Sequence, residues 1–172
     1  MDRKLKPHHL SFIIRKSRGF TLIELMVVLS ITAVLGTFGI AGFTTYNQIQ
    51  ILQSAASDVV SVLNLAKSRA QSQIKPSSLC SSSGSLEGYK VEILTPKAYT
   101  LYLRCNESGS PVDNLVEEKT KVLPSDLNFG SNVSFFFPVQ TGGVQTSGQI
   151  VISGYGRSKT ITVNSLGGVS IQ

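Results

Sequence analysis

Residues 18–43 read RGFTLIELMVVLSITAVLGTFGIAGF, and this stretch sets the main constraint on the fold. No charged residue occurs between Leu25 and Ser57, and residues 25–43 form a run of 19 nearly apolar positions. A helix needs about 20 apolar residues to cross the roughly 30 Å hydrocarbon layer of a membrane. The stretch therefore predicts a transmembrane helix over residues 20–43.

The formal charge of +6 is concentrated before this helix. Residues 1–19 hold six of the 16 Lys and Arg residues and one of the ten Asp and Glu residues. Because basic residues flank only the N-terminal side of the apolar run, the positive-inside rule predicts a cytoplasmic N-terminus and an exported C-terminus.

The same charge distribution argues against two classes of function, nucleic-acid binding and catalysis. Residues 20–172 hold 10 basic and 9 acidic residues, so this part has no positive surplus to bind the phosphates of a nucleic acid. Both histidines, His8 and His9, precede the apolar run. If the leader is removed, no imidazole is left to act as a general base or zinc ligand. We therefore expect neither an enzyme nor a bound metal or cofactor.

Glu24 is the anomaly of the apolar run. A carboxylate near the centre of a bilayer costs about 2.5–3.5 kcal/mol on insertion scales, so it needs a partner or a purpose. A cut between Gly19 and Phe20 would create an α-amino group one helical turn away, and the two charges could neutralise each other. The alternative is a signal anchor that tolerates an acid near the headgroups.

Residues Arg18–Leu25, RGFTLIEL, resemble the cleavage and assembly motif of type IV prepilins and of the pseudopilins of type II secretion. The resemblance implies cleavage after Gly19 by the prepilin peptidase and N-methylation of Phe20 by the same enzyme. It also implies that Glu24 engages the N-terminus of a neighbouring subunit in a filament. Many relatives carry a helix-breaking proline near Ala41, which this chain lacks.

An ordinary secretory signal peptide is the competing interpretation of the leader and apolar run. Its apolar region should span about 7–15 residues and end in an A-x-A-like site. This run is longer, contains an acid, and offers only Gly39-Ile40-Ala41 as a poor cleavage site. We therefore favour the prepilin interpretation.

Beyond Phe43 the apolar residues recur with helical spacing, which predicts that the helix continues to about Gln73, before Pro76. One face should pack on a domain of the same chain, and coiled-coil pairing with a partner is the alternative. The apolar stripe is Ile49, Leu52, Ala56, Val59, Leu63, Ala66 and Ala70.

Residues 76–172 carry β signals with serine-rich and glycine-rich turns. Residues 77–88 are expected to form a loop, and residues 165–168 the turn of a final hairpin. The predicted fold class is α+β: a long N-terminal helix, transmembrane and then amphipathic, packed on a small antiparallel β domain as in pilins. The expected segments are a cleaved leader (1–19), a transmembrane and assembly helix (20–43), an amphipathic helix (44–75) and a β domain (76–172). The expected strands are Tyr89–Leu94, Ala98–Arg104, Val133–Phe137, Gln149–Ser153, Thr160–Asn164 and Gly168–Ile171.

Residues 52–70 and 160–171 resemble the H-type minor pseudopilins of type II secretion and the related FimU- and FimT-type minor pilins. Gly168 departs from the pattern, because many relatives have an arginine there. The resemblance implies a non-catalytic subunit of a type II secretion pseudopilus or a type IV pilus.

Cys80 and Cys105 both lie in the exported part, where an oxidising compartment favours one disulfide. The alternative is two free buried thiols. Two thiols without a histidine fall short of the four ligands of a structural zinc site.

Two other groups of residues have structural interpretations. Of Phe135, Phe136 and Phe137, two should lie in the core and one at an interface. The acids Asp113, Glu117, Glu118 and Asp126 are interpreted as part of a solvated loop rather than as paired catalytic carboxylates.

The expected partners are the prepilin peptidase and N-methyltransferase, other major and minor pilin or pseudopilin subunits, and inner-membrane lipid before assembly. The chain should be a single-pass protein of the inner membrane, with a periplasmic or extracellular C-terminal domain that later joins a filament. Two alternatives stay open: a DNA-uptake minor pilin, and a secreted or anchored domain with an unusual signal peptide. DNA is the less favoured partner because Arg157 and Lys159 are the only basic residues after Lys121.

Overall fold

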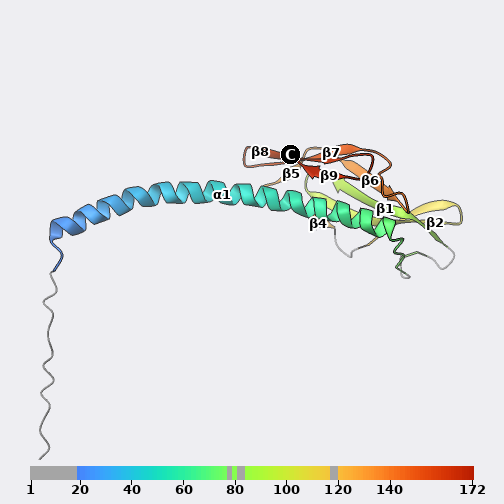
Figure 1. Ribbon diagram of the computed structural model, residues 1–172, viewed down its shortest axis with the longest axis horizontal. Coiled ribbons are helices and arrows are strands. Elements are labelled where there is room, and N and C mark those ends of the chain that lie inside the picture. Colours follow the sequence, from blue (N-terminus) through green and yellow to red (C-terminus); the bar gives the residue numbers. More distant parts are fainter. Residues whose placement is uncertain (1–18, 77–78, 81–83, 117–119) are drawn as a thin grey trace, which may run out of the picture. The chain divides into compact units, whose positions relative to one another are not determined.

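One long helix and nine strands make up the regular structure of the computed structural model, which describes residues 19–76, 79–80, 84–116 and 120–172 (Figure 1). The chain divides between Phe43 and Thr44 into two units, which are described separately below. Apart from Gly19, the expected leader lies outside the described residues, as do Glu117 and Glu118. The elements are α1 (Leu22–Gln71), β1 (Ser85–Leu94), β2 (Ala98–Glu107), β3 (Ser110–Leu115), β4 (Lys121–Val122), β5 (Asn128–Phe129), β6 (Val133–Pro138), β7 (Gly148–Gly154), β8 (Arg157–Val163) and β9 (Val169–Ile171).

Helix α1 is 50 residues long and passes through Ala41 without a break. Its end at Gln71 lies two residues before the expected one. Gln73 adopts a left-handed φ of 50°, its N–H donates to the Ala70 carbonyl, and the N–H of Ile74 donates to the Arg69 carbonyl. This is the Schellman arrangement that ends many helices, with glutamine in the position that glycine usually takes.

The apolar stripe of the outer half of α1 is buried as expected, except at its first member. Ile49 is 38% exposed. Ala55 and Val62 are also buried, so the packed face is wider than the stripe. The members of the stripe that are buried are Leu52, Ala56, Val59, Leu63, Ala66 and Ala70.

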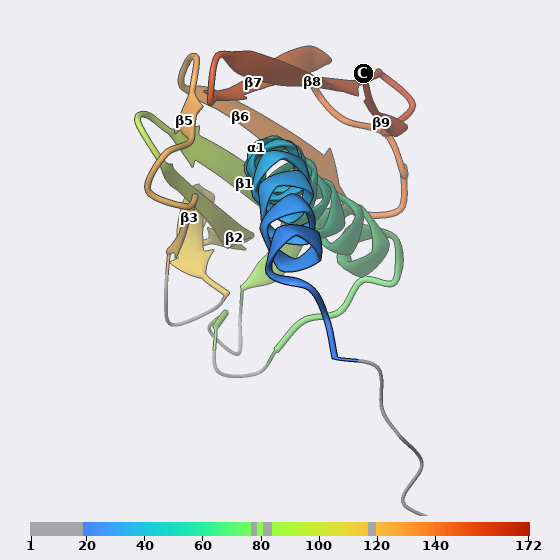
Figure 2. The ribbon, with the colours of Figure 1, turned by 90° about the vertical axis from the view of Figure 1, so that its left-hand side faces the viewer.

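The β domain consists of two antiparallel sheets. Sheet A has the strand order β3-β2-β1-β6, with β4 also paired to β2, and sheet B has the order β5-β7-β8-β9. Viewed along the helix, the two sheets lie on different sides of the green half of α1 (Figure 2). The α+β fold with a long N-terminal helix and antiparallel sheets is therefore confirmed.

Alternating residues of the strands point into a single core that the helix shares. Phe135 and Phe137 are buried whereas Phe136 is half-buried, which confirms that two of the three rings belong to the core. The other buried residues with the expected alternation are Tyr89, Val91, Ile93, Tyr99, Leu101, Leu103, Ile161 and Val163.

The sequence prediction was wrong at the start of β1. The strand begins at Ser85, inside the expected loop 77–88, because Ser85 and Leu86 pair with Asn106 and Cys105 before a β-bulge that precedes Gly88. Residues 77–78 and 81–83 of that loop lie outside the described residues.

Strands β3, β4 and β5 were not predicted. β4 and β5 have two residues each. β3 is exposed along most of its length and contains Pro111, so it lacks the apolar alternation by which strands are recognised.

Gly88 allows β6 to lie against β1, and its replacement tests this packing. A Cβ atom at residue 88 would collide with the carbonyl oxygen of Phe137 and would lie 2.9 Å from the Phe136 ring. We expect Gly88→Ala to lower the free energy of unfolding by about 1–3 kcal/mol, because the backbone would have to move. Urea unfolding of the detergent-solubilised chain measures this change. Gly130→Ala is the matched control, because its Cβ would meet only Val151 at an ordinary 3.5 Å; equal losses in both variants would contradict the packing argument.

Candidate functional site

The N-terminal end of α1 is organised by Thr21. The N–H of Glu24 donates to Thr21 Oγ1 at 3.2 Å, and the N–H of Leu25 donates to the Thr21 carbonyl at 3.2 Å. Thr21 is therefore the N-cap, and Glu24 is the third helical residue. The spacing of Thr21 and Glu24 is that of a capping box, a signal that the sequence analysis missed.

The three residues of the expected processing and assembly motif lie together at this helix end. Gly19 and Phe20 precede the N-cap, and the Phe20 side chain is 78% exposed. Glu24 lies in the first helical turn, where the helix dipole favours a negative charge. No cation in the described part of the chain forms an ion pair with its carboxylate. The carboxylate is therefore available to a group outside the described chain.

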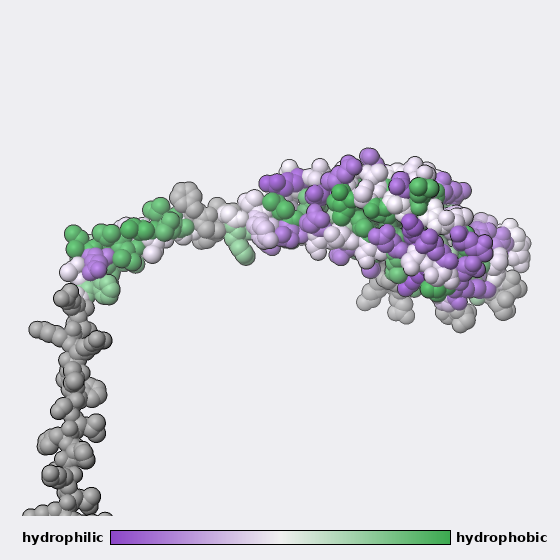
Figure 3. Space-filling view, in the orientation of Figure 1, coloured by the Kyte–Doolittle hydropathy of each residue, from purple (hydrophilic) through white to green (hydrophobic). Residues whose placement is uncertain are grey.

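The first unit exposes an almost continuous apolar surface, visible in green along its part of the helix in Figure 3. Within the described residues, α1 alone is long and apolar enough to cross a membrane, and its most apolar stretch is buried by nothing in this chain. Such a surface is suited to lipid or to an apolar bundle, and not to water. The residues of this surface that are more than half exposed include Phe20, Leu22, Ile23, Met26, Leu29, Val34, Leu35 and Phe43.

The hydroxyl groups within this apolar segment are satisfied inside the helix. Ser30 donates to the Met26 carbonyl at 2.8 Å. Thr32 donates to the Val28 carbonyl at 2.9 Å, and Thr37 donates to the Val34 carbonyl at 2.7 Å. These bonds lower the cost of burying hydroxyls in hydrocarbon, which leaves Glu24 as the polar side chain that still needs a partner.

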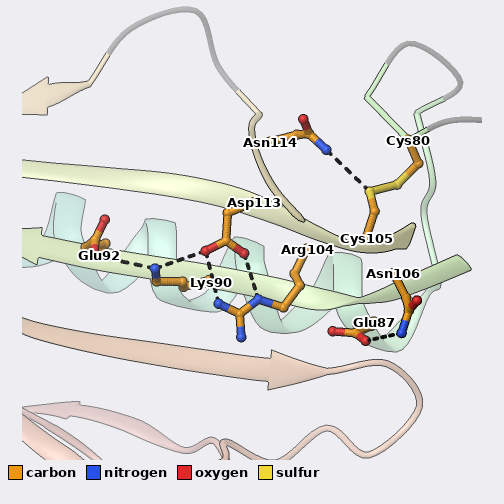
Figure 4. A network of polar contacts seen from close by, with 9 residues as sticks. All are labelled: Cys80, Glu87, Lys90, Glu92, Arg104, Cys105, Asn106, Asp113 and Asn114. Atoms are coloured by element: carbon orange, nitrogen blue, oxygen red, sulfur yellow. Dashed lines mark hydrogen bonds and ion pairs between the residues drawn. A yellow bond between two sulfur atoms is a disulfide. The ribbon is translucent and has the colours of Figure 1, made fainter. Parts of the chain in front are cut away.

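Sheet A carries a network of charged side chains on its outer face (Figure 4). Arg104 binds Asp113 through two bonds, Nε to Oδ1 at 2.7 Å and Nη2 to Oδ2 at 3.0 Å. Lys90 Nζ lies 3.1 Å from Asp113 Oδ2 and 3.4 Å from Glu92 Oε1. The Arg104 guanidinium also lies over the Phe136 ring, 4.9 Å from its centre. The network therefore links all four main strands of sheet A.

The solvated-loop interpretation of Asp113 was wrong, because Asp113 lies on β3 opposite Arg104. The hydrogen bonds from Arg104 lower the pKa of the Asp113 carboxyl below its usual value, against the opposing effect of partial burial. The Ser108-Gly109 dipeptide was the sequence signal from which a turn before β3 could have been predicted. Both residues have positive φ and form the turn between β2 and β3.

Cys80 and Cys105 form a disulfide, with their Cα atoms 5.9 Å apart. Cys105 is fully buried, and Asn114 Nδ2 donates to its sulfur at 3.6 Å. The bond ties the segment after α1 to the end of β2. By chain-entropy accounting, closing a loop of this size stabilises the fold by about 3 kcal/mol.

In the described ranges, no three His, Cys, Asp or Glu side chains lie close enough together to hold a metal ion. The start of α1 combines an exposed peptide bond, a capped helix end and, at the head of an apolar surface, a carboxylate that has no ion pair among the described residues.

Two family models match the chain. The model of the prokaryotic N-terminal methylation motif matches residues 14–40, and the model of the type II transport protein GspH matches residues 55–167. The second match covers more than half of the chain. Searches of curated proteins and of solved structures returned no significant match.

The charged network of sheet A predicts a specific dependence of stability on acid. Because the pKa of Asp113 is lowered in the folded state, its contribution is complete above the ordinary value of 3.8 and is lost as the pH falls through the lower folded value. Asp113→Asn should therefore lower the free energy of unfolding by about 1 kcal/mol at neutral pH, with a difference that vanishes in strong acid. Urea unfolding at a series of pH values measures this difference.

Asp58→Asn is the control for that series. Asp58 is exposed on α1, and no hydrogen bond or ion pair links it to the described residues. The acid dependence of this variant should match that of the unmodified chain. If the free energy of unfolding of Asp113→Asn were lower than that of the unmodified chain by the same amount at every pH, the charge of the Asp113 carboxylate would contribute nothing to stability.

Proposed function

The chain belongs to the GspH family of type II transport proteins, and from this membership we propose how it is matured and assembled. It is a minor pseudopilin, a structural component of a type II secretion pseudopilus or of a pilus. The observation that carries this function is the presence of a methylation motif and a GspH domain in one chain. Family members are structural proteins that are anchored in the membrane, processed by the prepilin peptidase and assembled with other pilins.

We propose that the peptidase cleaves between Gly19 and Phe20 and that the new N-terminus of Phe20 is then methylated. The geometry of the helix end supports this assignment. Both residues precede the N-cap at Thr21, so the peptide bond between them is not part of the helical hydrogen-bond ladder. An exposed peptide bond outside the helix can enter a protease site without unwinding α1.

Before assembly, residues 20–43 form the membrane span, and the basic leader 1–19 holds the N-terminus in the cytoplasm. The amphipathic helix 44–75 and the β domain 76–172 are then exported, which matches the oxidised pair Cys80 and Cys105. A straight helix over residues 25–43 covers about 28 Å, close to the hydrocarbon thickness. We place the chain in the inner membrane as a single-pass protein.

During assembly, Glu24 pairs with the methylated α-amino group of an adjacent subunit. In hydrocarbon or in a filament core, two unpaired charges would each cost several kcal/mol, and pairing removes most of this cost. Because Glu24 requires a partner, the ion pair specifies the axial position of one subunit relative to its neighbour. An apolar helix surface alone would fit the neighbour at many axial positions. The partners in this step are other major and minor pilin or pseudopilin subunits.

The N-terminus of the mature protein tests the processing step. The chain isolated from its native membrane should begin at Phe20 and carry one additional methyl group. Intact-mass measurement with N-terminal sequencing checks both points. A chain that begins near Gly42, or one that retains the leader, would refute the maturation pathway.

Glu24→Ala tests the assembly step separately from processing. The variant should still be cleaved and methylated, because Glu24 lies beyond the scissile bond. Its incorporation into filaments should fall by roughly 100-fold, the factor that corresponds to about 2.5–3.5 kcal/mol for an uncompensated charge. The ratio of filament-bound to membrane-bound protein measures this effect.

Asp58→Ala is the matched control, since it removes an exposed acid from the outer half of the same helix. It should assemble normally. If Glu24→Ala assembles as efficiently as Asp58→Ala, the ion-pair mechanism is wrong even where processing occurs as proposed.

A further inference from the structure

Strand β9 is a free edge of sheet B. It pairs with β8 alone, and Figure 2 shows it as the last strand of that sheet, near the C-terminus. Thr160 and Gln172 exchange two backbone hydrogen bonds, of 3.1 and 2.8 Å, and Asn164 N–H donates to the Gly168 carbonyl at 3.0 Å. In antiparallel pairing the bonded residues alternate, so Ser170 faces β8. The N–H and C=O groups of Val169 and Ile171 therefore point away from the sheet.

The other sheet edges in the described part of the chain carry protective features. β3 contains Pro111 and the charged Asp113, and β5 has only two residues. The outer side of β6 is engaged by Gln145, whose N–H donates to the Phe136 carbonyl at 2.9 Å, and β6 ends at Pro138. Proline, charge and coverage are the usual means by which proteins prevent edge strands from pairing.

β9 has none of these features. Residues 165–172 contain no proline and no charged residue. The Lys67 amine, which lies beside the turn before β9, is already bonded to the carbonyls of Leu166 and Gly167 at 3.4 and 3.0 Å. Val169 and Ile171 are only half-buried and pack at the margin of the core. An uncharged, extended, partly apolar strand is therefore the segment that this edge accepts best.

We infer that β9 pairs antiparallel with β9 of a second copy of this chain, which joins two sheets B into one continuous sheet. The edge is self-complementary about Ser170: Val169 of each copy faces Ile171 of the other, and each such pair exchanges two hydrogen bonds. Among the described edge strands, only β9 combines three or more residues with no proline, no charged residue and no backbone hydrogen bond on its outer side. The interaction is independent of whether Glu24 acts as proposed above.

The register gives a direct test by cross-linking. Ser170 is exposed and faces its own symmetry mate in a pair without hydrogen bonds, where Cα atoms lie about 4.5 Å apart. This separation falls within the range that a disulfide spans. The detergent-solubilised full-length Ser170→Cys variant should form a covalent dimer under mild oxidation, and a reductant should reverse it. The native cysteines are already joined to each other, so the introduced thiol is the only one available.

Ser153→Cys is the matched control. Ser153 is likewise an exposed serine of sheet B, but its strand β7 is paired on both sides, by β5 and β8. This variant should remain monomeric under the same conditions. Equal dimer yields from Ser153→Cys and Ser170→Cys would overturn the inference, as would a monomeric Ser170→Cys.

Two further variants test the edge itself. Ile171→Pro keeps the hydrogen bonds between β9 and β8, because the backbone donor that it removes points away from β8, although it also replaces a side chain at the margin of the core. In the Ser170→Cys background it should reduce the dimer yield about tenfold. Ser170→Lys places two ammonium groups opposite each other and should abolish the concentration-dependent dimer in analytical ultracentrifugation, whereas Ser153→Lys should retain it. If Ile171→Pro fails to fold, the Ser170→Lys comparison decides. A dimer that persists in Ser170→Lys refutes pairing through β9.

Discussion

Both sheets depend on one contact, the face that the outer half of α1 presents to them. Four of its buried residues are alanines (Ala55, Ala56, Ala66 and Ala70), and larger residues such as Val59 and Leu63 lie between them. Alanine adds little volume to this face, and the larger side chains contribute most of its buried apolar surface. The buried residues of α1 and of both sheets belong to one cluster, so the helix is part of the core of the whole β domain.

The same helix therefore meets two different environments along its length. Its outer half is soluble because a domain of the same chain covers its apolar face, and its inner half exposes apolar side chains in nearly every direction. No residue of the described chain relieves that exposure, so the inner half requires a lipid or protein environment. A pseudopilin uses this requirement twice, first for residence in the membrane and then for packing in a filament. The cap at Thr21 leaves Gly19 and Phe20 outside the helix, so the proposed processing site is accessible before assembly.

The sequence was most informative where burial imposes a period. The spacing of the stripe from Leu52 to Ala70 identified the helix face, and the alternation around Val91 and Ile161 identified strands and their inward residues. Strand β3 could not be recognised in this way, because it is held by pairing with β2 and by the Arg104–Asp113 ion pair, and neither leaves an apolar pattern. The roles of Gly19, Phe20 and Glu24 were predicted from residue type and order alone. The N-cap role of Thr21 was recognised only from its hydrogen bond in the structure, although its three-residue spacing from Glu24 is visible in the sequence.

The disulfide has a mechanical consequence for any load that is applied to α1. Such a load reaches the sheets first through the packed face of the helix. Once this face separates, a chain without the disulfide would carry the load only along the backbone that leaves Gln71 and enters β1 at Ser85. With Cys80 joined to Cys105, the load passes through a covalent bond into β2, which is hydrogen-bonded to β1, β3 and β4. The force is then shared in shear by many backbone hydrogen bonds instead of opening them one at a time. The Cys80–Cys105 bond is thus a second, covalent connection through which sheet A resists force applied to α1.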